Sequence, residues 1–360
     1  MRDVILHVGH GKTGTSAIQC WLAQNKRAVA AAGMVYPDHP SLSRAERCGV
    51  TSGNICGDVG ALLGQLEEED LKWPADRAIL FSNELLFWKL EEIIEASVDL
   101  RSRYNFKVVL FIRNPLEMAN SAYHQRVKRG GETGSFEDYL QQEGHLLHAE
   151  KCHRLLLKNN IETRLINYSA RSADVVGAFI DALDLDKDGS LGSVEKSMPI
   201  RVNRSLSLTE LELVKQLNKL SGRKSGSDFS DWLVELAPDI ESYRFTAEGE
   251  LLNRFRERFS ASVGYFNLFL PETEQLDHGS APCIRRNDLH EIDQRQMEAI
   301  AAAVGAILRD RDSLAAERDA IHRELKRIVR HPWKNFGQFF KGRLQRRPYV
   351  IGGQIAPVGE

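Results

Sequence analysis

Residues 4–16 read VILHVGHGKTGTS, and this segment is the most informative one in the chain about the fold. Its first five residues form an apolar, partly β-branched run that is typical of a buried parallel strand. The run ends at Gly9, and a helical pattern follows in which Ile18, Trp21 and Leu22 share one side. A strand that passes through a glycine-rich turn into a helix is the opening unit of an α/β protein.

Strand and helix patterns continue to alternate along the chain. Further strands are predicted at residues 78–81, 106–112 and 161–166. A helical pattern follows each of these strands. The first covers residues 85–100, the second begins with Asn114 as its cap and Pro115 in its first turn, and the third includes Val175, Phe179 and Leu183. This order predicts a P-loop-like, open, mostly parallel sheet with helices on both faces. Residues 205–285 are predicted to add mainly helical structure, interrupted by the polar stretch 221–230.

The glycine-rich turn suits a phosphate. Backbone N–H groups at the start of a helix, together with the positive end of the helix dipole, favour an anion. Lys12 adds a positive charge, and the hydroxyl side chains add hydrogen-bond donors. A plain strand-to-helix turn is the alternative, but it would not require this composition. The candidate phosphate-binding residues are Gly9, His10, Gly11, Lys12, Thr13, Gly14, Thr15 and Ser16.

The turn does not match the loop of nucleoside triphosphatases. In G-x-x-x-x-G-K-[ST], the first glycine would stand at position 6, which is Leu6. Such enzymes also place an aspartate after a later strand to hold Mg²⁺. Here the second predicted strand is followed by Ser82 and Asn83, and the third by Arg113. The arginine favours a second anion pocket, in which Ser121, about two helical turns further on, would bind the same phosphate.

Two anion sites, one after the first strand and one after the third, resemble those of the sulfotransferases that use 3′-phosphoadenosine 5′-phosphosulfate (PAPS). In that family, G-x-x-K-T-G-T-S is the 5′-phosphosulfate loop and R-x7-S is the 3′-phosphate site. Both patterns stand here, as residues 9–16 and as Arg113 with Ser121. Residues 201–207 resemble a segment that covers the cofactor in bacterial members, which implies contacts from Asn203 and Ser205. Residues 251–265 resemble a helical region of the family, and the likeness covers about residues 1–275.

The resemblance implies an enzyme that moves a sulfuryl group in line from PAPS to an acceptor hydroxyl or amine, with no metal required. Lys12 and the loop amides would stabilise the leaving phosphate. Glu84, just after the second strand, is the candidate general base, because carbohydrate and tyrosyl-protein members resemble this chain in having a glutamate near that strand end. Glu84 is otherwise a first-turn acid favoured by the helix dipole. His10 is the rival base, whereas His7 alternates with apolar residues and is expected to be a core histidine.

A third motif lies in residues 184–195, which read DLDKDGSLGSVE. The spacing fits the calcium-binding loop D-x-D-x-D-G-x5-E. Pro199 stands where the exiting helix should run, and the chain has no second copy of the motif. A plain connecting loop is therefore the alternative to a calcium site.

The composition is that of a soluble globular protein. The 360 residues suggest two domains, or one large domain with additions. The five cysteines are scattered without C-x-x-C spacing, which indicates free thiols in a reducing compartment and neither a disulfide framework nor a zinc site. The longest apolar run, around Gly305, is about half a membrane span, and the start lacks the apolar core of a signal peptide. We therefore expect a cytoplasmic protein.

The C-terminal part is predicted to be a long helix. One heptad column is apolar in five successive repeats, at Ile300, Ile307, Leu314, Ile321 and Ile328. Its partner column is interrupted by Arg311 and Arg318, so residues 297–328 form either a coiled coil that makes a homodimer or a helix that lies along its own domain. The predicted domains are a sulfotransferase-like α/β domain, a long helix and a basic aromatic tail, at residues 1–285, 286–330 and 331–360.

The tail is basic and the rest of the chain is acidic. Residues 323–360 carry a formal charge of +7, which leaves −9 for the remainder. Trp333, Phe336 and Phe340 stand at helical spacing among the basic residues, which suits either anionic lipid or docking on the protein's own body. We expect no nucleic-acid partner, because one short basic tail on an acidic body offers few phosphate contacts.

The function expected from these observations is a PAPS-dependent sulfotransferase. Its acceptor is expected to be a glycan or glycolipid, on the strength of Glu84 and the membrane-peripheral tail. Two other functions stay open. A P-loop kinase or other NTPase is the first, against which Leu6 and Arg113 count. The second is a non-catalytic, nucleotide-binding assembly protein that would use the helix at residues 297–328.

Overall fold

A computed structural model describes most of the N-terminal part of the chain and pieces of the C-terminal part. The described residues are 1–9, 11–49, 51, 53–55, 59–186, 191, 204–279, 300, 303–304, 310–311, 313–323, 350–351 and 354–355. They belong to two compact units, Met1–Gln296 and Met297–Glu360. None of the helices that these residues form has the length and hydropathy needed to span a membrane.

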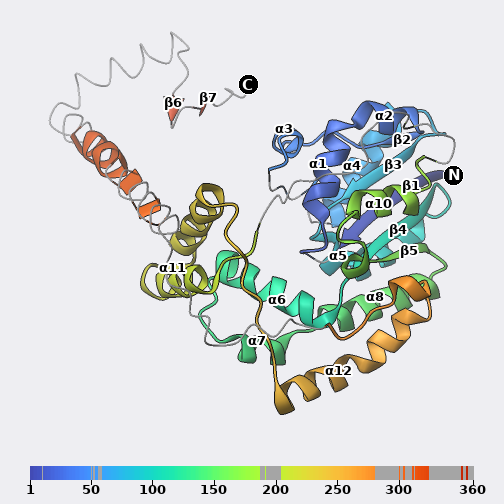
Figure 1. Ribbon diagram of the computed structural model, residues 1–360. Coiled ribbons are helices and arrows are strands. Elements are labelled where there is room, and N and C mark those ends of the chain that lie inside the picture. The colour runs from blue at the N-terminus through green and yellow to red at the C-terminus, as the bar shows by residue number, and fades with distance from the viewer. Residues whose placement is uncertain are drawn as a thin grey trace, which may run out of the picture. The chain divides into compact units, whose positions relative to one another are not determined.

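The first unit is built on a five-stranded, all-parallel sheet (Figure 1). Its strands are β1 (Arg2–Gly9), β2 (Met34–Val35), β3 (Ala78–Ser82), β4 (Tyr104–Ile112) and β5 (Glu162–Asn167), in the order β2-β3-β1-β4-β5. The central strand β1 pairs with β3 and β4, with Val4 opposite Ile79 and Phe106. This confirms the predicted α/β fold with an open parallel sheet. The two-residue strand β2 had too short a pattern to be predicted.

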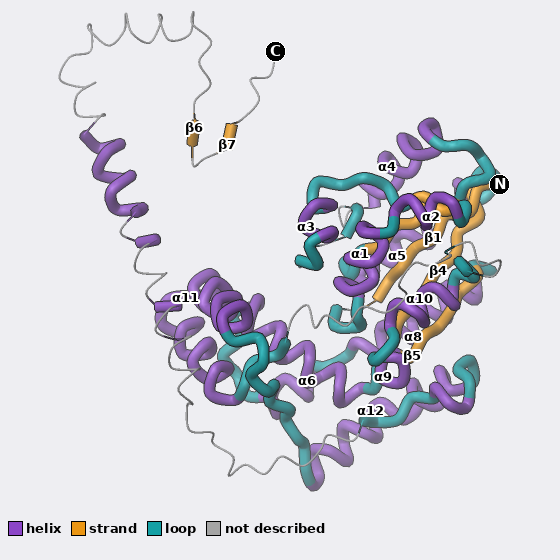
Figure 2. Tube along the Cα trace, turned by 45° about the horizontal axis from the view of Figure 1, so that its top comes forward, coloured by secondary structure: helices purple, strands orange, loops and turns teal. Residues whose placement is uncertain are grey.

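Helices cover both faces of this sheet, as predicted. On one face, Ile5 belongs to a core cluster with Trp21 of α1 (Thr15–Gln24) and Phe179 of α10 (Val175–Ala182). On the other face, Leu6 lines a small apolar cavity with Leu90 of α5 (Leu86–Ser97) and Leu156 of α8 (His145–Lys158). Neighbouring residues of a strand point to opposite faces, so β1 contributes to both cores. Figure 2 shows α9 (Tyr168–Arg171) and α10 following β5 back along the sheet.

The remaining elements complete the two units. The first unit also contains α2 (Lys26–Ala31), α3 (Leu42–Glu46), α4 (Val59–Lys72), α6 (Pro115–Gln125), α7 (Phe136–Gln142), α11 (Leu208–Leu236) and α12 (Gly249–Asn267). Short turns of other helix types are η1 (Val98–Leu100), the π-helical η2 (Arg126–Gly130) and η3 (Glu272–Glu274). In the second unit, β6 (Val350–Ile351) and β7 (Gln354–Ile355) pair antiparallel.

The predicted interruption at residues 221–230 is confirmed at Gly222 and wrong for the rest of the stretch. Helix α11 consists of two helical segments that meet in a kink at Gly222, where φ is 78° and ψ is 173°, and the second segment includes the remaining polar residues. Its buried residues there are Gly226, Phe229, Ser230 and Leu233. They stand at the i, i+3, i+4, i+7 spacing of one helix face, so burial of that face keeps a polar sequence helical.

The prediction of free thiols is wrong for two of the cysteines. Cys20 on α1 and Cys48, just after α3, form a disulfide, with their Cα atoms 4.9 Å apart. The two positions are 28 residues apart in the chain, and only the packing of α3 against α1 brings them together. Cys152 is a buried free cysteine, as predicted, whereas Cys56 and Cys283 lie outside the described residues.

Several predictions concern residues that are described only in part. Among the apolar heptad positions, Leu314 and Ile321 are exposed on a helix, while Ile307 and Ile328 lie outside the described residues. The dimer therefore stays a prediction. The aromatic tail at residues 331–349 lies outside the described part of the chain. Most of the calcium motif does too, so the calcium site also stays a prediction; within it, Asp186 Oδ1 accepts a hydrogen bond from the Leu191 amide.

Candidate functional site

The loop between β1 and α1 has the backbone of an anion-binding turn. Lys12 has a φ of 76° and Gly14 one of 80°, so left-handed residues alternate with others along the turn. Such alternation turns successive N–H groups toward one side and makes a concave anion site. Gly14 is also the N-cap of α1, and no side chain caps that helix end. The first N–H groups of α1 therefore receive no side-chain oxygen there.

A buried hydroxyl in this loop has no partner. Thr15 is 5% exposed, and within the described residues its Oγ1 atom forms no hydrogen bond. Burying a hydroxyl without a hydrogen bond costs about 1–3 kcal/mol. The backbone of the turn and this orphaned donor fit a phosphate group, which would accept hydrogen bonds from both.

Glu84 lies directly against the loop. Its Oε2 atom is 3.3 Å from the point that a Cβ atom at Gly11 would occupy. The turn that carries Glu84 is fixed by Asn83, which is fully buried; its Oδ1 accepts from the Leu85 amide at 2.7 Å, and its Nδ2 donates to the Ile55 carbonyl. The structure therefore brings the predicted base to the predicted phosphate loop, although the two are far apart in the sequence.

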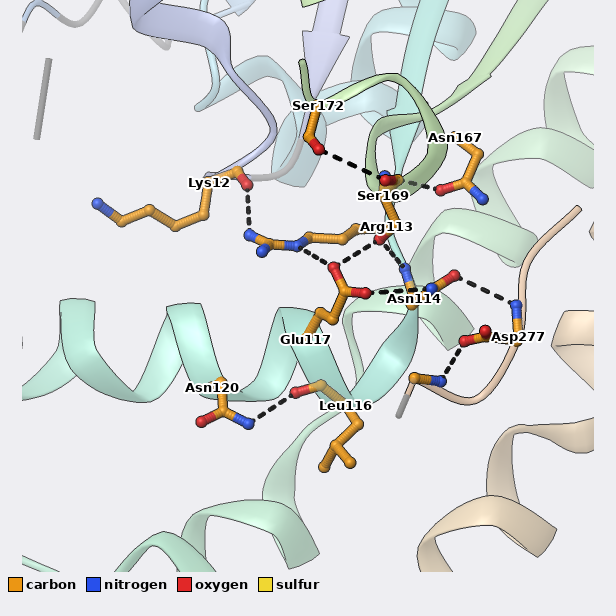
Figure 3. Close-up of polar contacts among 11 residues, drawn as sticks. Lys12, Arg113, Asn114, Leu116, Glu117, Asn120, Asn167, Ser169, Ser172 and Asp277 are labelled. Atoms are coloured by element: carbon orange, nitrogen blue, oxygen red, sulfur yellow. Dashed lines mark hydrogen bonds and ion pairs between the residues drawn. The ribbon is translucent and has the colours of Figure 1, made fainter. Parts of the chain in front are cut away.

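Lys12 and Glu84 influence each other's ionisation. Burial lowers the pKa of Lys12 to about 8, and the charge of Glu84 opposes that change. Burial raises the pKa of the Glu84 carboxyl, and the charge of Lys12 opposes that change. Within the part of the chain that is described, the Lys12 ammonium forms no ion pair, and Figure 3 shows its side chain extending away from Arg113. This leaves a desolvated cation at the loop for an anionic ligand.

Arg113 fastens the loop at the end of β4 (Figure 3). Its Nη1 atom donates to the Lys12 carbonyl at 2.9 Å, and its guanidinium carbon lies 5.0 Å from the centre of the Tyr168 ring. Its Nε atom is 3.4 Å from Glu117 Oε2. Arg113 thus joins the two strand ends, β1 and β4, which the sequence predicted to carry separate anion sites.

Glu117 is a residue that the sequence analysis missed. Besides Arg113, it accepts hydrogen bonds from the Ser169 hydroxyl at 2.8 Å and from the Asn114 amide at 3.2 Å (Figure 3). Asn114 is the N-cap of α6 as predicted, but its side chain does not cap the helix. The spacing of four residues between Arg113 and Glu117 could have indicated this contact, since side chains at i and i+4 meet on a helix.

A second missed residue is Lys128, in the π-helical turn η2. It is only 2% exposed, and its Nζ atom donates to the Arg204 carbonyl at 3.3 Å. Burial, followed by the charges of Lys12 and Arg129, lowers its pKa to about 7. Arg129 is paired with Asp231, at 2.7 Å from Nη1 to Oδ2. The charges of Lys12 and Lys128 therefore repel each other, and a bound anion would relieve that repulsion.

The other predicted site residues have the following positions. Ser121 lies half-buried on α6; it and Arg113 are both described, and no hydrogen bond joins them. Ser205 follows Arg204 before α11, and its carbonyl accepts from the Ser242 hydroxyl at 3.0 Å. His10 and Asn203 lie outside the described residues. The roles of these four residues stay predictions.

His7 is a core histidine, as predicted. It is fully buried, its Nδ1 atom is 2.8 Å from the Ser82 hydroxyl, and its ring lies between those of Phe111 and Phe179. Burial lowers its pKa to about 3, so the ring is neutral at ordinary pH. A neutral, enclosed imidazole supports the strand ends and is not available to a substrate.

Comparison with known proteins gives distant structural likenesses. No protein-family model matches the chain, and no curated protein matches it. The chain is similar to a sulfotransferase from Alicyclobacillus acidocaldarius, at 15% identity over 75% of this chain and 96% of that one, with a TM-score of 0.39. The sulfotransferase domain from the curacin biosynthetic pathway matches at 13% identity over 72% and 98%, with a TM-score of 0.33.

A third likeness is to retinol dehydratase, solved with androsterone and the inactive cofactor PAP. It has 14% identity over 76% of this chain and 82% of that one, with a TM-score of 0.28. At such scores the likenesses assign neither an activity nor a ligand to this chain. The fold class is established by the strand order and the parallel pairing of its own sheet.

Proposed function

We propose that this chain is a PAPS-dependent sulfotransferase and that its acceptor is a hydroxyl group of a glycan. The observation that carries the proposal is the contact of Glu84 with the loop that holds Lys12. A carboxylate beside a desolvated lysine, at the carboxyl ends of adjacent parallel strands, provides a base and an anion site for one reaction.

The loop and Lys12 would hold the leaving group. When bound, PAPS supplies the sulfuryl group and the phosphate from which it departs. The loop N–H groups, the Thr15 hydroxyl and the Lys12 ammonium would donate to the phosphate oxygens, where negative charge increases as the sulfur–oxygen bond breaks. Such donors act strongly in a desolvated site because little water competes with them.

Glu84 would act on the acceptor. A hydroxyl becomes a nucleophile for the sulfur atom when its proton is taken, and the Glu84 carboxylate would accept that proton as the new oxygen–sulfur bond forms. Burial raises the pKa of Glu84, which makes its carboxylate a stronger base than an exposed one. One turn further along, the half-exposed ring of Trp88 offers a flat apolar surface of the kind that can pack against a sugar.

Arg113 would contribute to the other end of the donor. Its guanidinium already holds the Lys12 carbonyl and lies near Glu117, so it is oriented from two sides. Ser121 would join it at the 3′-phosphate, as the R-x7-S pattern implies. Lys128 and Arg129 would add positive charge in the same region, because their charges act on Lys12 or on each other.

Calorimetric titration tests the donor site. Adenosine 3′,5′-bisphosphate is compared with ATP and Mg²⁺ on the wild type and on Arg113→Ala. We expect micromolar binding of the bisphosphate, weakened at least tenfold by the substitution and not matched by ATP. Binding of Mg-ATP alone would favour the kinase. Binding of neither ligand would exclude the sulfotransferase.

A further inference from the structure

Three side chains with different metal-binding atoms meet between α5 and α8, outside the site described above. They are Glu91 on α5 and His148 and Cys152 on α8. One ligand atom from each lies within 4.8 Å of the other two. Glu91 and His148 are half-buried, and Cys152 is fully buried.

We propose that Glu91, His148 and Cys152 form a binding site for a single zinc-like divalent cation that joins α5 to α8. His148 and Cys152 are four residues apart, so they share one face of α8. Glu91 Oε1 is 4.0 Å from His148 Nδ1, and the Cys152 Sγ atom lies beside the same ring, 3.4 Å from its other nitrogen, Nε2. Ligand atoms each about 2.0–2.3 Å from one zinc ion lie closer together than the 4.8 Å found here, so the three side chains would draw together when the ion binds.

The hydrogen bond of His148 leaves a lone pair for the cation. Its Nε2 atom is 3.1 Å from the Phe87 carbonyl, which can only accept, so the proton of a neutral ring stands on Nε2. The other nitrogen, Nδ1, then presents a lone pair toward the carboxylate of Glu91. A cation between these two acceptors, either a metal ion or a second proton on the ring, removes their mutual repulsion. Metal-binding histidines commonly donate their second nitrogen to a backbone carbonyl in this way.

The surroundings hold the ring in place. Trp88 stacks on the His148 ring, with centroids 4.8 Å apart and an angle of 27° between the planes, and Phe87 meets it edge-on at 4.8 Å. Glu91 is also oriented, because Lys151 Nζ lies 2.8 Å from its Oε2 atom. That ion pair uses the second carboxylate oxygen and leaves Oε1 facing the histidine.

The donor set indicates the class of metal. A thiolate, an imidazole and a carboxylate together suit zinc rather than calcium or magnesium, which prefer oxygen atoms alone. Burial raises the pKa of the Cys152 thiol to about 12, so the metal has to displace a proton when it binds. A water molecule would complete the four ligands. Because the ion would join two helices, its expected effect is to stabilise the fold.

The site was not visible in the sequence. The H-x-x-x-C pair lacks the C-x-x-C spacing of zinc motifs, and the third ligand stands on another helix. The proposal does not depend on the sulfotransferase activity, since none of its ligands belongs to the phosphate loop. A protonated His148 paired with Glu91 is the competing explanation, and metal titration separates the two.

The test uses the full chain after treatment with a chelator. Cobalt(II) is added first, because a cobalt–thiolate bond gives a charge-transfer absorption band in the near ultraviolet; zinc is then titrated in competition. We expect one ion per chain, the cobalt band, and a Tm that rises with zinc concentration. His148→Gln and Cys152→Ser should each weaken zinc binding at least tenfold, as loss of a ligand does. Glu92→Gln, at an exposed acid on the same helix α5, should leave it unchanged.

One further variant sharpens the test. Lys151→Ala removes a positive charge that lies next to the site and repels a metal cation, so zinc should bind more tightly to it than to the wild type. Absence of the cobalt–thiolate band in the wild type would overturn the proposal, whether or not the ligand variants fold. Zinc binding that His148→Gln and Cys152→Ser leave intact, in folded protein, would also overturn it, since the ion would then lie elsewhere.

Discussion

Replacing the Glu84 carboxylate with an amide tests the proposed chemistry most directly. The side chain of Glu84→Gln has the same shape, so it can keep its place against the loop, where Oε2 lies 3.3 Å from the Cβ position of Gly11. What disappears is the proton acceptor. Loss of a general base typically lowers turnover by about 10²–10⁴-fold, which is roughly 3–5 kcal/mol of transition-state stabilisation.

The same substitution has a predictable effect on the donor site. The negative charge of Glu84 raises the pKa of Lys12, which burial lowers to about 8. Without that charge, the pKa of Lys12 should fall further in the free protein, while the repulsion between the Glu84 carboxylate and a bound anion disappears. These two effects oppose each other, so affinity for adenosine 3′,5′-bisphosphate should stay close to that of the wild type while turnover falls.

The assay measures sulfuryl transfer from PAPS to a glycan acceptor as a function of pH. In the wild type, kcat should fall as the pH drops through the pKa of Glu84, which burial holds above the usual value for a glutamate. This acidic limb should vanish in Glu84→Gln. Glu95→Gln, at an exposed acid on α5, is the matched control. Turnover of Glu84→Gln within threefold of the wild type, or an equal loss of nucleotide binding, would refute the role of Glu84.

Two further predictions concern the scaffold. Gly14→Ala should destabilise the fold by about 1–3 kcal/mol in urea unfolding and weaken bisphosphate binding, because φ is 80° there and a Cβ atom would lie 2.6 Å from Val175 Cγ2. Gly64→Ala is the control, since a Cβ atom at this position inside α4 would have no neighbouring atom within 4 Å, and this substitution should stabilise the fold. Equal effects of the two substitutions on the free energy of unfolding would contradict this reasoning. Burial lowers the pKa of His124 to about 3, so the unfolded chain binds a proton below pH 6.5 that the folded chain does not, and stability should fall as the pH is lowered from 6.5 toward 4. In His124→Gln the free energy of unfolding should depend on pH less steeply, by about 1.4 kcal/mol per pH unit, whereas substitution of the exposed His322 by Gln should leave this dependence unchanged. An unchanged dependence in His124→Gln would show that the folded chain takes up the proton as well.

The local structure of this protein could be predicted from its sequence. The strand, the glycine-rich turn and the helix of residues 2–24 depend on patterns within a few residues: an apolar run, glycines that permit a left-handed backbone, and an apolar stripe at helical spacing. The order of such units also determined the parallel sheet, since strands joined through helices pair in that way. The carboxyl ends of parallel strands lie at one edge, so the placement of Glu84 near the loop followed as well.

Contacts between distant elements were decided by tertiary structure. The disulfide of Cys20 with Cys48, the burial of Lys128, and the meeting of Glu91 with His148 and Cys152 each depend on how one element packs against another. Sequence spacing describes neighbours on one helix or strand and carries no comparable signal for two elements that pack together. The pKa values of Lys12 and Glu84 likewise depend on tertiary packing, because desolvation is a property of the whole packed site.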